Sequence, residues 1–174
     1  QSDLESYNII SEIVRNAEIT NDTIGISVYD KQSKDANIIC AKAADELLTI
    51  GNITASFVIG NVGDVISISG RSIGDINVQI ILEKMGGGGH SILAGAQIEG
   101  KTIEEVKNEL TEKINEYFDD LYNSMINNRE IKGKFNLVNE MSYETYRETV
   151  DKLIEEKEYL IKEYENGRNV NIYD

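Results

Sequence analysis

The chain has 174 residues, 40% of them hydrophobic, and its formal net charge at pH 7 is −14. This apolar content supports a packed core and excludes a disordered acidic segment. The acidic balance argues against a nucleic-acid polymer as partner, because binding of a polymer needs clustered lysine and arginine. A short nucleotide held by a few local contacts is compatible with the charge.

No stretch approaches the roughly 18 consecutive apolar residues of a membrane span, and no signal-peptide pattern occurs. Because the chain begins at Gln1, we expect it to be a piece of a longer protein, from which a membrane anchor could have been cut. Cys40 is the only cysteine, so no internal disulfide can form. It lies in an apolar-periodic segment, where we expect a buried, unreactive thiol that fits a reducing cytosol.

The first part of the chain alternates helical and strand patterns. Apolar residues at helical spacing predict one helix over residues 3–17 and an alanine-rich helix over residues 36–48. Runs of β-forming residues predict strands over residues 23–29, 53–59 and 65–69. A hairpin turn at residues 61–64 is predicted to join the last two strands.

The middle of the chain is predicted to contain one more short helix, over residues 76–85, with Asp75 as its N-cap. The glycine run 86–89 ends this helix, because glycine is costly inside one. Residues 91–96 are rich in small side chains and predict a single helical turn. Residues 97–99 predict a brief strand.

The last third of the chain is predicted to be helical. Thr102 and Glu105 match a capping box, which predicts a helix that continues to about residue 128. The sequence Lys132-Gly133-Lys134 then breaks the pattern, Ser142 is a candidate N-cap for a final helix, and Asn166-Gly167 supplies a stop. The final helix carries a heptad-like apolar stripe formed by Tyr146, Val150, Leu153, Leu160 and Tyr164.

Together these elements predict an α/β (α+β) fold, with a small mixed sheet, flanking helices and a C-terminal helical extension. We divide the chain into a linker helix at residues 1–21, a central domain at residues 22–118 and a helical extension at residues 119–174. The heptad-like stripe leaves two interpretations open. The final helix packs on its own domain, or it forms a homodimer as part of a helical hairpin.

The most informative motif is Gly86-Gly87-Gly88-Gly89-His90. Consecutive glycines leave the backbone amides bare and tolerate positive φ angles, and the only histidine of the chain follows directly. Bare amides beside an imidazole suit an anionic group such as a phosphate. The alternative is a flexible turn followed by an ordinary histidine.

Three polar residues upstream of the glycine run are further candidates. Arg71, at the end of a predicted strand, suits a bidentate contact with a phosphate, although a plain surface arginine is the alternative. Ser72 and Asn77 flank the next helix start, where amides and short polar side chains could orient a nucleotide. Asn77 offers the donors and acceptors that adenine recognition requires; the alternative there is helix capping.

Other catalytic schemes lack their residues. The sequence has no Gly-x-Ser-x-Gly elbow and no Walker-type Gly-Lys-Ser/Thr motif. One histidine and one cysteine, far apart in the chain, do not make a metal site of recognisable spacing. We therefore expect a chain that holds phosphate without cleaving it unaided, with no catalytic residue and no metal ligand of its own.

Three of these segments together resemble a known family. The segments Ala55 to Ile59, Ser69 to Gln79 and Gly86 to His90 resemble the C-terminal substrate-binding domain of the DHH-family phosphoesterases, with the greatest likeness to the GdpP-type cyclic-di-AMP phosphodiesterases of Gram-positive bacteria. The helix segment Ala41 to Leu48 also resembles the helix before the sheet in those proteins. The resemblance covers roughly residues 1–118.

The resemblance implies a role for each candidate residue. His90 and the glycine loop would contact a substrate phosphate; the loop consists of Gly86, Gly87, Gly88 and Gly89. Arg71 would help to neutralise the charge of that phosphate, and Asn77 would touch the base or ribose. Ser72 is a further candidate for substrate binding. It also implies that a separate DHH lobe, missing from this chain, holds two Mn²⁺ ions that activate water for attack on phosphorus. The implied substrate is cyclic-di-AMP and the implied product linear pApA. The full-length protein would be anchored in the membrane with this domain in the cytosol.

Residues 119–174 match nothing in this family. Two alternatives to a cyclic-di-AMP phosphodiesterase stay open. The chain could be one lobe of a relative that degrades oligonucleotides or single-stranded DNA. It could instead be a non-catalytic dimerisation module in which the glycine loop is vestigial.

Overall fold

The computed structural model describes residues 3–127 and 143–166. Their contacts divide the chain into two compact units, Gln1–Asp119 and Asp120–Asp174. Each unit is described by itself. In the first, six strands form one mixed sheet in the order β1-β2-β3-β4-β6-β5, in which β2 and β3 are parallel and all other neighbours antiparallel. This arrangement confirms the predicted fold class.

The elements of the first unit follow the chain in a regular order. The strands are β1 (Glu18–Thr20), β2 (Ile24–Tyr29), β3 (Ala55–Val62), β4 (Val65–Ser72), β5 (Gly88–His90) and β6 (Leu93–Glu99). The helices are α1 (Asp3–Arg15), α2 (Ala36–Leu47), α3 (Val78–Glu83) and α4 (Ile103–Asn127), the last of which continues past the boundary of the unit.

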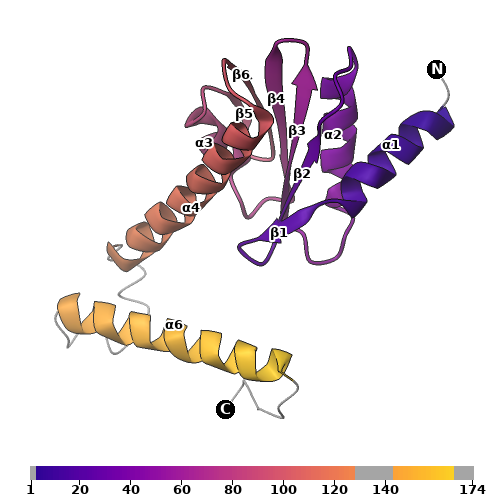
Figure 1. The fold of residues 1–174 in the computed structure, drawn as a ribbon. Coiled ribbons are helices and arrows are strands. Elements are labelled where there is room, and N and C mark those ends of the chain that lie inside the picture. The colour runs from indigo at the N-terminus through magenta and orange to yellow at the C-terminus, as the bar shows by residue number, and fades with distance from the viewer. Residues whose placement is uncertain (1–2, 128–142, 167–174) are drawn as a thin grey trace. The chain divides into compact units, whose positions relative to one another are not determined.

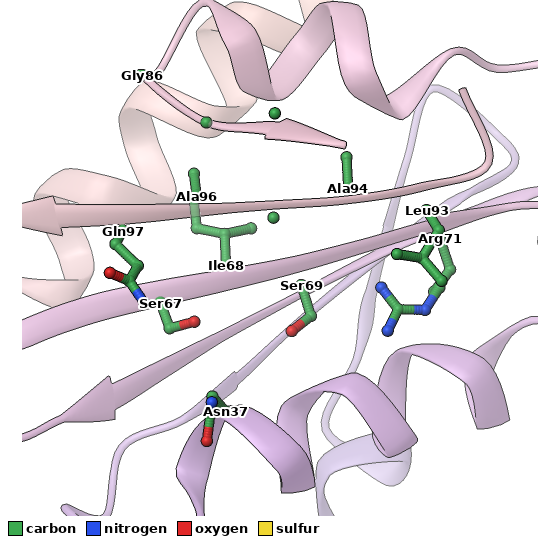
Figure 2. Close-up of a pocket in the computed structure, with 13 residues that line it drawn as sticks. Asn37, Ser67, Ile68, Ser69, Arg71, Gly86, Leu93, Ala94, Ala96 and Gln97 are labelled. Carbon is green, nitrogen blue, oxygen red and sulfur yellow. The ribbon is translucent and has the colours of Figure 1, made fainter. Parts of the chain in front are cut away.

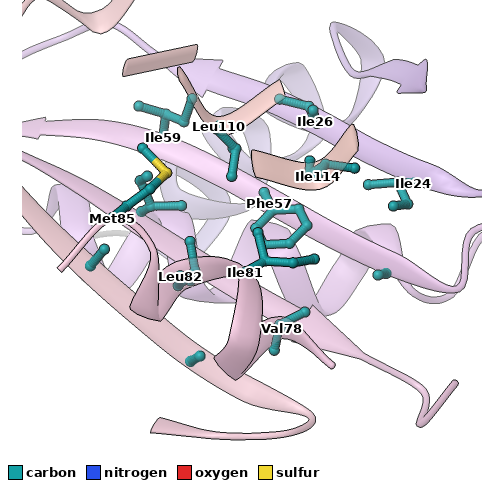
Figure 3. Packing of buried hydrophobic residues seen from close by; sticks show 14 of the residues in the cluster. Ile24, Ile26, Phe57, Ile59, Val78, Ile81, Leu82, Met85, Leu110 and Ile114 are labelled. Atoms are coloured by element: carbon teal, nitrogen blue, oxygen red, sulfur yellow. The ribbon is translucent and has the colours of Figure 1, made fainter. Parts of the chain in front are cut away.

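Helices cover both faces of the sheet, with α1 and α2 on one side and α3 and α4 on the other (Figure 1). Successive side chains of a strand point to opposite faces, so β3 serves both layers. Phe57 and Ile59 lie in the core cluster with α3 and α4 (Figure 3), whereas Val58 packs against α2. Cys40 of α2 is buried in the second cluster, as expected, and burial raises the pKa of its thiol to about 12.

The long helices and the central strands were predicted correctly, but the segment around the glycine run was not. Gly88–His90 forms strand β5. In place of the predicted helical turn at residues 91–96, Ser91 and Ile92 form a turn and residues 93–96 begin β6, which ends with the predicted brief strand at residues 97–99. The side chains of β6 that point into the core, Ala94 and Ala96, are buried but small. Hydropathy therefore alternates only weakly along β6, and the sequence gives no clear strand pattern there. Strand β1 is also absent from the prediction; it falls within the segment 1–21 assigned to a linker helix.

The start of α3 differs from the prediction as well. Its N-cap is Asn77, whose Oδ1 accepts a hydrogen bond from the backbone N–H of Ile80 at 3.1 Å, and not Asp75. The backbone N–H of Asn77 donates to the hydroxyl of Tyr117 at 3.1 Å, which ties the beginning of α3 to α4. The helix therefore begins two residues later than its apolar pattern predicts.

The second unit contains the C-terminal part of α4 and the helix α6 (Tyr143–Glu165). The hydroxyl of Tyr122 donates a hydrogen bond to the carboxylate of Asp151. Leu153 and Tyr159 of α6 are exposed. The predicted break at residues 132–134 and the candidate N-cap Ser142 lie outside the described residues. Among the helices that the structure describes, none has the length and apolar character needed to cross a bilayer.

Candidate functional site

A cleft of about 670 Å³ lies on the α2 side of the sheet, over β4, β6 and the glycine run (Figure 2). Its volume is typical of small-molecule sites. Helix α2 packs against β2, β3 and β4, and the cleft opens where the sheet continues past this helix. The lining residues are Asn37, Ser67, Ile68, Ser69, Arg71, Gly86, Gly87, Gly88, Leu93, Ala94, Gly95, Ala96 and Gln97.

Strand register explains why polar side chains gather in the cleft. Ser67, Ser69 and Arg71 alternate along β4, so all three point to the same face of the sheet. Directly opposite them on β6 stand Gln97, Gly95 and Leu93 in that order, and Gly88 of β5 pairs with Gly95. Directly opposed residues share a face, so these positions form a continuous floor.

Arg71 is fixed in place at one end of the floor. Its Nε donates to Oδ1 of Asp45 on α2 at 2.9 Å, and its Nη1 donates to the carbonyl of Gly70 at 2.9 Å. The side chain is only 13% exposed, although Asp45 is 64% exposed. A guanidinium has five N–H donors, so donors remain for a bidentate contact with an anion. Arg71 is the one charged residue among the described residues that line the cleft.

The fold itself requires glycine at three positions of the glycine run. Gly86 and Gly89 have φ angles of +81° and +142°, which L side chains rarely adopt. A Cβ on Gly87 would stand 2.2 Å from the carbonyl oxygen of Gly95. A Cβ on Gly88 would meet nothing within 4 Å and would enter open space. Packing of the fold therefore does not require glycine at position 88, and the missing side chain keeps the backbone accessible from the cleft.

His90 lies at the end of β5, where its backbone pairs with Leu93, which in turn pairs with Arg71. The three residues thus share one row and one face of the sheet. The imidazole is exposed, and neither His90 nor Gly89 is among the residues that line the cleft. His90 stands at the rim, next to the Arg71 end of the floor.

The structure does not bring Ser72 and Asn77 into the cleft. Ser72 pairs in register with Ala55, which belongs to the core on the other face, and its Oγ accepts a hydrogen bond from the backbone N–H of Gly74 at 3.0 Å. Asn77 uses its Oδ1 to cap α3. Both side chains thus shape the segment between β4 and α3.

Sequence reasoning missed five polar residues of the site. They are Asn37, Asp45, Ser67, Ser69 and Gln97. The alternation of Ser67 and Ser69 with Ile66 and Ile68 was visible and predicted a strand, but it did not show that the serine face is uncovered. The contributions of α2 depend on packing between distant segments and left no local signal.

Within the described residues, no group of three or more histidine, cysteine, aspartate or glutamate side chains gathers in a way that could hold a metal ion. The cleft offers hydroxyls, amides and a single guanidinium. The resemblance assigns its two Mn²⁺ ions to the separate DHH lobe, so no step at this cleft is assigned to a metal.

The fold is that of a mixed α/β domain with an open cleft on one face of the sheet, and a comparison with known families identifies the domain. The chain belongs to the DHHA1 domain family, whose model matches residues 18–120. It is 40% identical over 110 residues to the cyclic-di-AMP phosphodiesterase GdpP of Geobacillus thermodenitrificans, a match that covers 63% of this chain and 17% of that protein.

A second curated relative agrees with this placement, and a solved structure shares the fold. The cyclic-di-AMP phosphodiesterase PdeA of Listeria monocytogenes is 38% identical over 119 residues, which cover 68% of this chain and 18% of that protein. An exopolyphosphatase-related protein from Bacteroides fragilis has a similar fold, with a TM-score of 0.60 and 19% identity over 67% of this chain and 36% of that one. The chain spans less than a fifth of the two curated relatives.

Proposed function

We propose that this chain is the substrate-binding half of a cyclic-di-AMP phosphodiesterase, which hydrolyses the cyclic dinucleotide to linear pApA. The observation that carries the proposal is the cleft in which a fixed Arg71 faces the bare backbone of the glycine run. The identity of 40% to a cyclic-di-AMP phosphodiesterase over this region supports it.

In this proposal the cleft binds a phosphate of the substrate. Arg71 neutralises its charge with the N–H donors that Asp45 and Gly70 leave free. Gly88 lets the ligand approach the backbone closely because no Cβ intervenes. His90 contacts the phosphate from the rim, and Gly86, Gly87 and Gly89 hold the run in the required conformation. Ser72 and Asn77 act indirectly, through the shape of the segment between β4 and α3.

The chemistry of cleavage belongs to a separate DHH lobe, whose two Mn²⁺ ions would activate the attacking water. We propose that this chain alone does not hydrolyse cyclic-di-AMP. We also propose that the complete protein is anchored in the membrane with this domain in the cytosol. A half-cleft lacks the contacts of its other half, so we expect weak binding by the isolated chain.

Calorimetric titration of the chain with cyclic-di-AMP, pApA and a short single-stranded oligodeoxynucleotide tests this function. We expect binding of both adenine dinucleotides and a weaker signal with the oligonucleotide, which the charge of −14 disfavours. His90→Ala should weaken dinucleotide binding about tenfold, whereas Ser91→Ala, on the adjoining turn, should leave it unchanged. Tighter binding of the oligonucleotide would favour a polymer-degrading relative, and no binding at millimolar concentrations would contradict the proposal.

A further inference from the structure

Five serines of the sheet are buried, and they fall into two groups by their hydrogen bonds. Ser27 and Ser56 donate to the carbonyls of Ile13 and Ala44, each at 2.6 Å, and Ser72 accepts from Gly74. Ser67 and Ser69 are each only 7% exposed, yet in the part of the chain that the structure describes neither hydroxyl has a hydrogen-bond partner. Among the described residues, no fully buried side-chain oxygen or nitrogen lacks a hydrogen-bond partner, so the hydroxyls of Ser67 and Ser69 are accessible from the cleft. Because the fold does not use them, they can form hydrogen bonds with a ligand.

Both hydroxyls point into the cleft, on the side of the sheet that faces Asn37 of α2 (Figure 2). The amide side chain of Gln97 stands opposite Ser67 on β6. This end of the cleft therefore offers hydroxyl and amide groups, which both donate and accept hydrogen bonds, and no charged side chain. Such a set suits a neutral group with several polar atoms better than a second phosphate.

The floor between these side chains is flat. Gly88 and Gly95 are directly opposite one another on β5 and β6, and Gly95 is in turn opposite Ser69. Two adjacent strands thus present bare backbone at one row of the sheet, which leaves room for a planar group. From Arg71, Ser69 is about 7 Å and Ser67 about 13 Å away along the strand, at roughly 3.3 Å per residue. These distances bracket the reach from a nucleotide's phosphate to the far edge of its base.

We propose that Ser67 and Ser69, together with Gln97, form a second subsite that binds the hydrogen-bonding edge of a nucleobase, while the base lies over Gly88 and Gly95. This inference rests on the proposed function, because it assumes that a phosphate occupies the Arg71 end. It assigns base recognition to the strand face of the cleft and not to Asn77, whose Oδ1 caps α3.

The test uses two probes that share a phosphate and a sugar, since only one of them has a base. The dissociation constants of adenosine 5′-monophosphate and ribose 5-phosphate are measured from amide chemical shifts on the 174-residue chain. The chain should bind the nucleotide more tightly. A Ser67→Ala, Ser69→Ala double variant should lose about tenfold in affinity for the nucleotide, through two lost hydrogen bonds, and should bind ribose 5-phosphate unchanged.

Two further variants keep the test sharp. Ser56→Ala removes a buried serine hydroxyl under α2 that the fold uses, so it should leave the preference for the nucleotide intact. Gln97 is exposed and lies opposite Ser67 on β6, so its replacement should not disturb the core. Gln97→Ala should weaken binding of adenosine 5′-monophosphate and leave binding of ribose 5-phosphate unchanged. This variant tests the subsite even if the double serine variant fails to fold.

The other possible results separate failure of the base subsite from failure of the phosphate site. Equal binding of the two probes by the wild-type chain, or full nucleotide affinity in the serine and Gln97 variants, overturns the base subsite but leaves the phosphate site standing. If neither probe shifts the amides of Arg71 and residues 86–90, the proposed function fails and the subsite fails with it.

Discussion

Gly87 and Gly88 are neighbours, but a side chain at each would have a different consequence. An added Cβ at Gly87 would overlap the carbonyl oxygen of Gly95 at 2.2 Å and Ala96 at 2.7 Å, whereas one at Gly88 would enter open space. The glycine run thus combines positions that build the β5–β6 pairing with one position that leaves the cleft open.

We therefore predict opposite effects for two adjacent alanine substitutions. Gly87→Ala should lower the free energy of unfolding by about 2–3 kcal/mol, because the backbone of β6 must shift. Gly88→Ala should change it by no more than about 0.5 kcal/mol and should weaken binding of cyclic-di-AMP, because the methyl group occupies the cleft. Urea denaturation and calorimetry measure the two quantities. Equal destabilisation by both variants, or full affinity in Gly88→Ala, would contradict this account of the glycines.

At the scale of elements, the start of α4 is the clearest case of a local signal that the structure uses. The backbone N–H of Glu105 donates to Oγ1 of Thr102 at 3.1 Å, and this hydroxyl donates to the Glu105 carboxylate at 3.2 Å. The pair confirms the predicted helix start, although the glutamate bonds the hydroxyl and not the backbone N–H of the capping residue.

Loss of this cap should be measurable, because α4 supplies Val106, Leu110 and Ile114 to the core. Thr102→Ala should lower the free energy of unfolding by about 1 kcal/mol. Thr102→Ser keeps a capping hydroxyl and should stay near the wild-type value. Thermal or urea unfolding of the two variants makes the comparison; an alanine variant as stable as the serine variant would show that the cap does not stabilise the domain.

The elements that the sequence predicted well are those with strong periodicity. The helices that became α2 and α4 carry regular apolar faces. Strand β4 alternates isoleucine with serine, and β3 is rich in β-forming residues. The predicted brief strand at residues 97–99 is the end of β6, but β5 and the first part of β6 were not predicted. Glycine and alanine supply most of the residues in those segments, and the pairing between the two strands holds them in place.

The same reasoning explains which parts of the site were predictable. Arg71 and the glycine run could be found because their residue types carry the chemistry by themselves. Ser67 and Ser69 could not, since their importance depends on the register between β4 and β6 and on where α2 ends. For Asn77 the sequence left two roles open, and the hydrogen bond to Ile80 shows that its side chain caps the helix.

At the scale of the whole molecule, the core residues of the first unit all precede residue 119. Every residue that lines the cleft also lies in that unit. The second unit is therefore not needed to build either the core or the cleft. Leu153 and Tyr159 of α6 are exposed, and sedimentation tests whether the final helix forms a homodimer.

We predict that a chain shortened to residues 1–127 keeps its unfolding temperature within a few degrees and binds cyclic-di-AMP with unchanged affinity. Circular dichroism and calorimetry measure these properties, and sedimentation of both chains shows whether residues 128–174 mediate self-association. A dimer lost on truncation would assign that role to the tail. Loss of nucleotide binding on truncation would contradict the assignment of the site to the first unit.

The central claim is that the cleft between Arg71 and the glycine run is a nucleotide half-site, and a backbone-amide NMR titration with cyclic-di-AMP tests it most directly. We predict shifts concentrated at Arg71, Gly86 to His90, and the facing residues of β4 and β6, and we expect the same titration in His90→Ala to need about ten times more ligand. Shifts confined to other parts of the chain, or none at millimolar ligand, would contradict the claim.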